Sequence, residues 1–319
     1  MNTTANGSSS LSCSSLINPE ALKVGATVAY SFILVVSLVG NTLIVLIVYK
    51  TPTLRKPINM FIANMAMSDL LFPIVLFPVR LTNLHVDSWR IGSTLGQALC
   101  KIHPFLADFS RLVSIQSLVL ITVDRFAAVV VPLRSPLISR KVCRCLIVGT
   151  WILAAAFHWP DLLIFKLVEF QEGKWCVNRM QLFRETSSSG SYALSISIFS
   201  FYIPFVILVI FYSIILIKLK KQAHPGVQSA SAEEQRTRRN RNVLKMAVAI
   251  VVAFFICWIP FYFVPENKLD FCKFWVSDNV TLLIAYTSCA INPIICLTFT
   301  RNYRQALRRL VNCCDAVQG

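Results

Sequence analysis

Seven long apolar runs are the feature that most limits how this chain can fold. They cover residues 25–50, 57–84, 97–130, 141–165, 190–220, 240–265 and 276–299. A run of about 20 apolar residues is long enough to cross the hydrocarbon core of a bilayer as a helix. Charged residues make up 14% of the chain, well below the roughly 25% of a soluble domain. The sequence therefore predicts an all-α membrane protein, a bundle of seven transmembrane helices.

The positive charges are concentrated on one side of these runs. If the N-terminus is extracellular, the cytoplasmic connections and the C-terminal segment hold 19 of the 31 Lys and Arg residues. Basic residues in short loops mark the cytoplasmic side of a membrane protein. We therefore expect an extracellular N-terminus (1–24), a seven-transmembrane domain (25–299) and a cytoplasmic end (300–319), with the chain in the plasma membrane. Contact with anionic lipid accounts for the basic charge, so no nucleic-acid partner is expected.

Both ends of the chain carry candidate modification sites. Asn2 and Asn6 begin Asn-x-Ser/Thr sequons, which are glycosylation acceptors in extracellular segments. Residues 300–314 separate basic from apolar side chains at helical spacing, which predicts a short amphipathic eighth helix in the membrane interface. Cys313 and Cys314 end this segment. Cysteines at such a position are candidates for palmitoylation.

Polar residues deep in the apolar runs are the first functional candidates. Ionisable side chains inside a membrane are costly, so each one implies a function or a specific partner. Those in the interior of the runs are Asp69, Asp108, Arg111, Asp124 and Arg125. Four of the five lie in the single run 97–130, which makes that run the centre of the candidate site.

Further residues mark every run in order along the chain. They are Gly40-Asn41; Asn64, Ala66, Asp69 and Leu70; Cys100 and, 25 residues later, Arg125 with Asp124 and Phe126; Trp151; Pro204 and Tyr212; Phe254, Cys257, Trp258, Pro260 and Phe261; and Asn292-Pro293, followed by RNYR. With these residues in register over about 28–310, the chain resembles the rhodopsin-like (class A) G-protein-coupled receptors, and most of all their neuropeptide group.

The resemblance implies an activation mechanism at the cytoplasmic side. Arg125 is expected to act as the pivot, held by Asp124 when the receptor is off. The expected activation residues are Asp124, Arg125, Tyr212, Phe254, Trp258, Pro260, Asn292 and Pro293. Arg125, Pro132 and Leu133 are expected to contact a heterotrimeric G protein, and arrestin and a receptor kinase are the further partners implied.

The chain departs from the family pattern at three positions. Asn240 stands where many members have an acidic residue on the sixth helix, and Phe126 stands where the family usually has tyrosine. Cys296 replaces the tyrosine whose hydroxyl approaches Tyr212 in active relatives. We expect Cys296→Tyr to raise basal signalling. These departures keep open a receptor that binds its ligand with weak or no G-protein coupling.

The resemblance also implies a disulfide and an ion site. Cys100 and Cys176 match the family's disulfide partners, and an extracellular location permits the bond. Cys13 and Cys272 are the other cysteines in outer segments, and a second disulfide between them is a hypothesis. The family's sodium pocket matches Asp69, Ser114, Ser288 and Asn292. The alternative is that Asp69 is hydrated, or is protonated through burial. No other cofactor is expected.

The outer half of the bundle contains the candidate ligand residues. Ala107 stands where amine receptors have an aspartate, and the seventh run contains no lysine, so amine and retinal ligands are disfavoured. The segments CKIHPFLAD, WRIG and LVEFQEGKWC resemble peptide receptors, and the last alternates as a β-hairpin does. The candidate ligand-binding residues are Arg80, Asp108, Arg111, Asp161, Phe261, Tyr262 and Glu266.

The charges of this candidate pocket leave the ligand open. Arg111 could receive an acidic group of a peptide, or it could pair internally with Asp108 at helical i,i+3 spacing. Asp161 and Glu266 would suit a basic peptide. Phe261 and Tyr262 could pack against the helix rather than touch a ligand. A non-peptide small molecule is the alternative ligand class.

Other functional classes find less support in the sequence. The four histidines, which are His85, His103, His158 and His224, look isolated, and no catalytic constellation is visible, so an enzyme is not expected. Transporters tend to carry internal repeats and channels a pore-lining filter, and the sequence shows neither.

Overall fold

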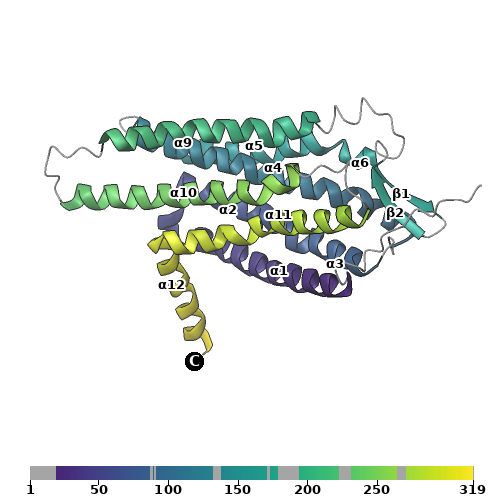
Figure 1. Cartoon of the computed structure of the whole chain (residues 1–319). Helices are drawn as coiled ribbons and strands as arrows, with labels where there is room; N and C mark the ends of the chain where they lie inside the picture. Colours follow the sequence, from purple (N-terminus) through teal and green to yellow (C-terminus); the bar gives the residue numbers. More distant parts are fainter. Residues whose placement is uncertain are drawn as a thin grey trace, which may run out of the picture.

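The computed structural model describes residues 19–86, 89, 91–131, 138–170, 173–178, 194–222, 231–263 and 271–318. Seven helical segments are long and apolar enough to cross a membrane. They pack side by side along one axis (Figure 1), and the predicted seven-helix bundle is confirmed. The main helices are α1 (Pro19–Lys50), α2 (Pro57–Asp69), α3 (Phe77–His85), α4 (Ser93–Val130), α5 (Arg140–His158), α9 (Ile203–Gln222), α10 (Ser231–Phe263) and α11 (Phe271–Phe299).

Three of the described spans are less regular than the apolar runs suggested. The fifth contains a π-helical turn, Ile198–Tyr202, before α9. The second span is interrupted by a π-helical turn, Phe72–Leu76, between α2 and α3. Pro73 lies in this turn and cannot donate a backbone hydrogen bond, which favours a local widening of the helix. The predicted fourth span, residues 141–165, agrees with the span Arg140–Ile164, but this span is not one continuous helix. Helix α5 ends at His158, Pro160 lies in a turn, and α6 (Asp161–Ile164) adds one turn before a strand begins.

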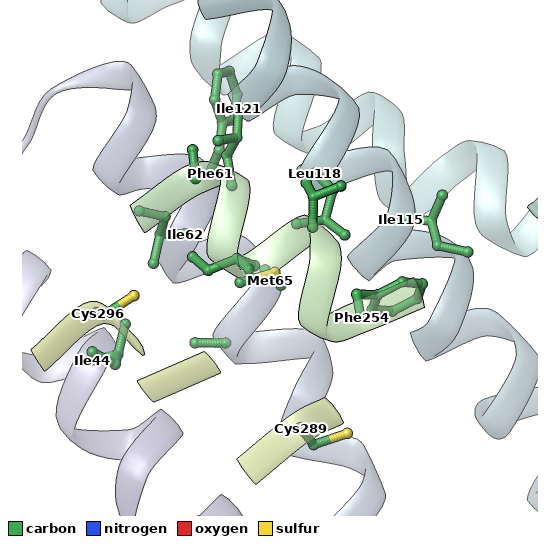
Figure 2. Close-up of a cluster of buried hydrophobic side chains, with 14 of the residues drawn as sticks. Ile44, Phe61, Ile62, Met65, Ile115, Leu118, Ile121, Phe254, Cys289 and Cys296 are labelled. Carbon is green, nitrogen blue, oxygen red and sulfur yellow. The ribbon is translucent and has the colours of Figure 1, made fainter. Parts of the chain in front are cut away.

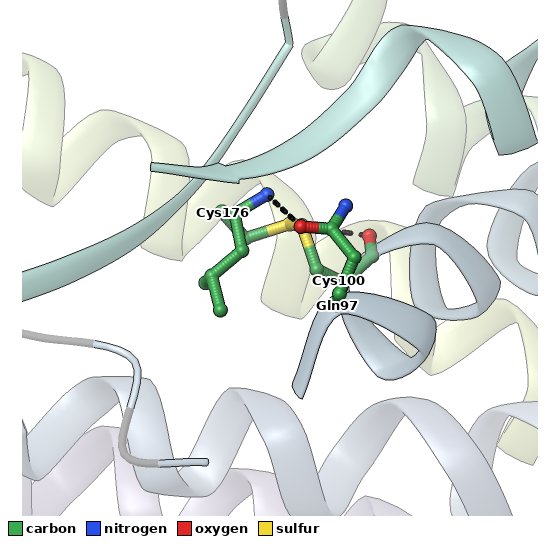
Figure 3. Close-up of a disulfide and its surroundings, with 4 residues drawn as sticks. Gln97, Cys100 and Cys176 are labelled. Atoms are coloured by element: carbon green, nitrogen blue, oxygen red, sulfur yellow. Dashed lines mark hydrogen bonds between the residues drawn. A yellow bond between two sulfur atoms is a disulfide. The ribbon is translucent and has the colours of Figure 1, made fainter. Parts of the chain in front are cut away.

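A β-hairpin covers the outer end of the bundle, as the alternating segment predicted. Strand β1 (Phe165–Phe170) pairs antiparallel with β2 (Gly173–Asn178), and Leu167 lies opposite Cys176. A disulfide joins Cys176 to Cys100 of α4, and the Leu167 amide donates to Gln97 Oε1 at 3.2 Å (Figure 3). The hairpin is therefore fixed to the outer end of α4 by a covalent bond and a hydrogen bond.

The helices pack around a core that combines apolar and polar contacts. Met65, Leu118 and Phe254 bring α2, α4 and α10 into one buried cluster (Figure 2). Beside it, Asn64 Nδ2 donates to Ser117 Oγ at 2.9 Å, and Trp151 Nε1 donates to Asn64 Oδ1 at 2.7 Å. Buried polar groups need such partners because an unpaired one costs about 1–3 kcal/mol. Asn64 thus connects α2, α4 and α5.

Large apolar side chains cover the outside of the bundle. Phe32 on α1 is 69% exposed and Ile152 on α5 is 63% exposed. Such exposure would be unfavourable in water over a wide surface. It is the arrangement expected of helices whose outer faces contact lipid hydrocarbon.

The chain ends in the predicted amphipathic helix, α12 (Arg301–Gln318), which turns away from the bundle axis at the end opposite the hairpin (Figure 1). Tyr303 anchors α12, because its ring is fully buried and its hydroxyl donates to Asn59 Oδ1 at 3.2 Å. Burial raises the pKa of the Tyr303 phenol well above its ordinary value, so the hydroxyl keeps its proton as a donor.

Several predicted residues lie outside the part of the chain that the structure describes. They are Asn2, Asn6, Cys13, Pro132, Leu133 and Glu266, together with the side chains of Asn240, Cys272, Cys313 and Cys314. The glycosylation, palmitoylation, second-disulfide and G-protein-contact predictions that rest on them stay predictions.

Candidate functional site

The centre of the bundle holds a buried carboxylate with neutral partners. Asp69, at the end of α2, is 3% exposed. Ser114 Oγ donates to its Oδ1 at 2.7 Å, and Asn292 Nδ2 donates to its Oδ2 at 2.9 Å. Within the described residues, no basic side chain lies at ion-pair distance from Asp69. An isolated carboxylate in a membrane bundle calls for a compensating charge.

The atoms around Asp69 have the chemistry of a site for a hard cation. The Oδ1 atom of Asn292 is buried and has no hydrogen-bond partner, so an acceptor oxygen remains available beside the carboxylate. Ser114 contributes a hydroxyl oxygen. Ser288, the fourth predicted member, instead accepts from Trp258 Nε1 at 3.2 Å. A carboxylate with neutral oxygens suits a hard cation, so the residues present fit the implied sodium ion.

Arg111 of α4 is buried against α10, with 6% of its surface exposed. Its guanidinium pairs with Asp108 at 2.5 Å, one helical turn away on α4. It also lies over the Trp258 ring at 5.1 Å and near the Tyr262 ring at 5.6 Å. Of the two alternatives for Arg111, the internal pair with Asp108 is the one present here. The Nε atom stays buried without a partner, so a donor remains for a further acceptor.

Arg80 has a partner that the sequence did not indicate. Its Nη2 lies 3.2 Å from Oδ2 of Asp278, so the pair joins α3 to α11 near the outer end of the bundle. Asp278 is 198 residues away in the chain. The one available signal was an acidic residue at the outer edge of the seventh apolar run, but nothing in the sequence paired it with Arg80.

Asp161 is paired with a histidine that the sequence analysis treated as isolated. Nδ1 of His158 lies 3.1 Å from Oδ2 of Asp161. The turn at Pro160 brings the last residue of α5 next to the first residue of α6. The prediction that His158 is isolated is therefore wrong, and its i,i+3 spacing from Asp161 was the signal available in the sequence.

The predicted aromatic residues of α10 pack within the bundle. The Tyr262 ring stacks on Phe201 with ring centroids 4.1 Å apart. Phe261 meets Trp258 edge to face at 5.8 Å. Tyr262 also lies near Arg111, and Phe261 contacts the predicted activation residue Trp258.

The half of the bundle that lies away from the hairpin contains the predicted pivot. Asp124 and Arg125, neighbours near the inner end of α4, form an ion pair. Tyr212 of α9 lies with its hydroxyl 3.2 Å from Thr122 Oγ1, a contact that the sequence analysis missed. Cys296 is fully buried in the apolar core cluster of Figure 2. The ion pair between Asp124 and Arg125 is present as predicted, and the role of Arg125 as a pivot stays a prediction.

Comparison with known proteins identifies the family that this sequence matches. Residues 40–295 match the family described as "7 transmembrane receptor (rhodopsin family)". A QRFP-like peptide receptor of Branchiostoma floridae is 28% identical, covering 93% of this chain and 80% of the relative. An allatostatin-A receptor of Bombyx mori is 30% identical, with 89% and 78% covered. The human neuropeptide Y receptor type 2 is 28% identical, with 92% and 77% covered.

Proposed function

Because this chain belongs to the rhodopsin family of seven-transmembrane receptors, we propose that it binds an extracellular peptide and activates a heterotrimeric G protein. The relatives it matches are peptide receptors by name. It is a multi-pass membrane protein, and the plasma membrane with the N-terminus outside is the location that follows from its basic inner segments. Arrestin and a receptor kinase complete the proposed set of partners.

The position of Arg111 is the observation that carries this proposal. Its guanidinium is paired with Asp108 and lies 5.1 Å from the Trp258 ring centre. Trp258 is two residues before Pro260, inside α10. A ligand that changes the partners of Arg111 therefore alters contacts on α10 directly. Differential affinity of this kind is what shifts a two-state equilibrium.

The charged residues in the outer half of the bundle favour a peptide with a basic group. Arg80 and Arg111 are each paired with one aspartate. The third aspartate, Asp161, has His158 as its partner, and a histidine, unlike an arginine, is not a permanent positive charge. The described charges therefore leave one carboxylate without a permanent positive partner, and an arginine or lysine of the ligand would supply it.

Sodium is the ion proposed for the centre of the bundle. It would be held by the Asp69 carboxylate, the Ser114 hydroxyl and the free Asn292 amide oxygen. Ser288 would act through Trp258, to which it is hydrogen-bonded. The ion would supply the charge that the buried carboxylate lacks, and no further cofactor is required.

Peptide-induced signalling in cells tests this function. We would express the full chain, screen short peptides with amidated and free-acid ends, and measure calcium and cyclic AMP. Peptides with a basic residue should elicit a response. Arg125→Ala should abolish it, whereas Arg55→Ala, at an exposed inner arginine, should leave it intact. A receptor present at the surface that answers no peptide would contradict the proposal, and so would a response that survives Arg125→Ala.

A receptor that binds ligand without coupling is the second candidate. It is favoured by Cys296, whose side chain is buried among apolar residues and offers no phenol to Tyr212. Agonist-dependent nucleotide exchange on purified G proteins separates the two candidates. Peptide binding without exchange on any G-protein class would support the non-coupling receptor.

A further inference from the structure

Three side chains from three helical segments converge in the outer half of the bundle. Asp108 comes from α4, His158 from the last turn of α5 and Asp161 from α6. One potential ligand atom from each residue lies within 4.8 Å of the other two. We propose that Asp108, His158 and Asp161 form a binding site for a divalent transition-metal ion, with Zn²⁺ as the ion that best matches the ligands.

The spacing of these atoms suits the size of a zinc site. Zinc binds histidine nitrogen and carboxylate oxygen at roughly 2.0–2.2 Å, in a tetrahedron whose edges are then roughly 3.3 Å long. His158 Nδ1 and Asp161 Oδ2 are already 3.1 Å apart. The remaining ligand separations, all within 4.8 Å, exceed a tetrahedral edge by at most roughly 1.5 Å.

The burial of the cluster favours an ion. His158 is 1% exposed and Asp161 is 7% exposed. The Asp108 side chain is 33% exposed, which provides a route for the ion. Three protein ligands leave one position of the tetrahedron open. Two carboxylates balance the double charge of the ion, which lowers the cost of burying it.

Arg111 competes with the ion for Asp108. The guanidinium is 2.5 Å from an Asp108 oxygen, and it is the nearest permanent positive charge that the structure pairs with this cluster. A bound ion would draw Asp108 away from Arg111. Removing the arginine charge should therefore tighten the binding of the ion, while removing a ligand should weaken it.

The site would also connect metal ions to the receptor's ligand. An ion on Asp108 and Asp161 would take the carboxylates that a basic peptide group needs, and so would weaken such a peptide. This consequence rests on the proposed function. The site itself does not, because its test needs neither an agonist nor a G protein.

Titration calorimetry with Zn²⁺ alone on the purified full chain in lipid nanodiscs is the direct test. We expect one saturable site that weakens by at least about tenfold in His158→Asn and in Asp161→Asn, since even changes next to metal ligands cost about 10- to 100-fold. His103→Gln, at another histidine of the outer half on α4, is the matched control and should bind as the parent does. Arg111→Met should bind more tightly, a gain that misfolding cannot produce.

Cobalt provides a second readout of the same site. Co²⁺ bound by three protein ligands in tetrahedral geometry should show strong visible absorption that Zn²⁺ displaces and that His158→Asn removes. Absence of a saturable site would overturn the proposal. Binding that is unchanged in both His158→Asn and Asp161→Asn, or that His103→Gln weakens as much, would overturn it too, because the ion would then lie elsewhere.

Discussion

Asn41 of α1 donates from Nδ2 to the backbone carbonyl of Cys289 on α11 at 2.9 Å. That carbonyl lies four residues before Pro293, which has no N–H to donate to it. The neighbouring residue Gly40 completes the contact, because a Cβ added there would lie 2.8 Å from Pro293 Cβ and Cγ. Gly40 thus leaves room for the ring of Pro293, and Asn41 supplies the hydrogen bond that Pro293 cannot donate.

Replacing Gly40 with alanine should destabilise the receptor. The new methyl group meets the Pro293 ring at 2.8 Å, so α1 and α11 must move apart, and overpacking of this kind costs about 1–3 kcal/mol. Gly25→Ala in the same helix is the control, because a Cβ there meets nothing within 4 Å. Thermal unfolding in detergent should show a lower midpoint for Gly40→Ala alone. Equal midpoints for the two variants would refute the close approach.

Asn41→Ala should also lower stability, for a different reason. It removes the donor to the Cys289 carbonyl in a buried place, and an unpaired buried carbonyl costs about 1–3 kcal/mol. The loss should disappear when Pro293 is replaced by alanine as well, since an N–H then returns to position 293. Unfolding midpoints of the single and double variants would measure this coupling. Additive losses would show that Asn41 acts elsewhere.

Sodium should stabilise the receptor through Asp69. In the parent chain, replacing potassium by sodium at constant ionic strength should raise the unfolding midpoint, because the carboxylate and the free Asn292 oxygen favour a small hard cation. Asp69→Asn should abolish the difference. Asp278→Asn, which changes a carboxylate near the outer end, should keep it. An equal sodium effect in Asp69→Asn and the parent would place the ion at another site.

Cys296→Tyr should raise basal signalling. Cys296 is fully buried in the core cluster, so a phenol cannot fit without displacing neighbours in the present packing. The larger side chain therefore disfavours the present helix packing. We expect it to favour a packing in which α11 has moved and the hydroxyl introduced at position 296 can approach Tyr212. Cys145→Tyr, at an exposed position of α5, is the control. Second-messenger output without agonist, at matched surface levels, should rise for Cys296→Tyr only; unchanged output would count against the idea.

The seven spans could be predicted because they depend on interactions within one segment of the chain. Apolar runs long enough to cross a bilayer must become helices, because backbone groups in lipid need partners within their own segment. The alternation in residues 167–176 predicted the hairpin for the same kind of reason. The length of the fourth span was predicted correctly, but its break was not, because the apolar composition continues past the turn at Pro160 and hydropathy alone does not indicate a turn.

The partners of the charged residues were harder to predict than their positions. Asp108 and Arg111 are one helical turn apart, so their pairing was one of two alternatives in the sequence. Arg80 and Asp278 come from segments 198 residues apart. Whether they meet depends on how α3 and α11 are rotated about their axes, which is decided by the packing of the whole bundle.

The sequence by itself determined the seven spans and the residues that could bear charge inside the membrane, and it predicted the orientation of the spans. These follow from hydropathy and helical spacing, which act over one segment at a time. Only the tertiary structure decided that His158 joins Asp108 and Asp161, that Arg111 lies over Trp258, and that Asn41 satisfies the Cys289 carbonyl. Each of these contacts joins segments whose distance and rotation are fixed by packing between helices, and packing is a property of the assembled bundle.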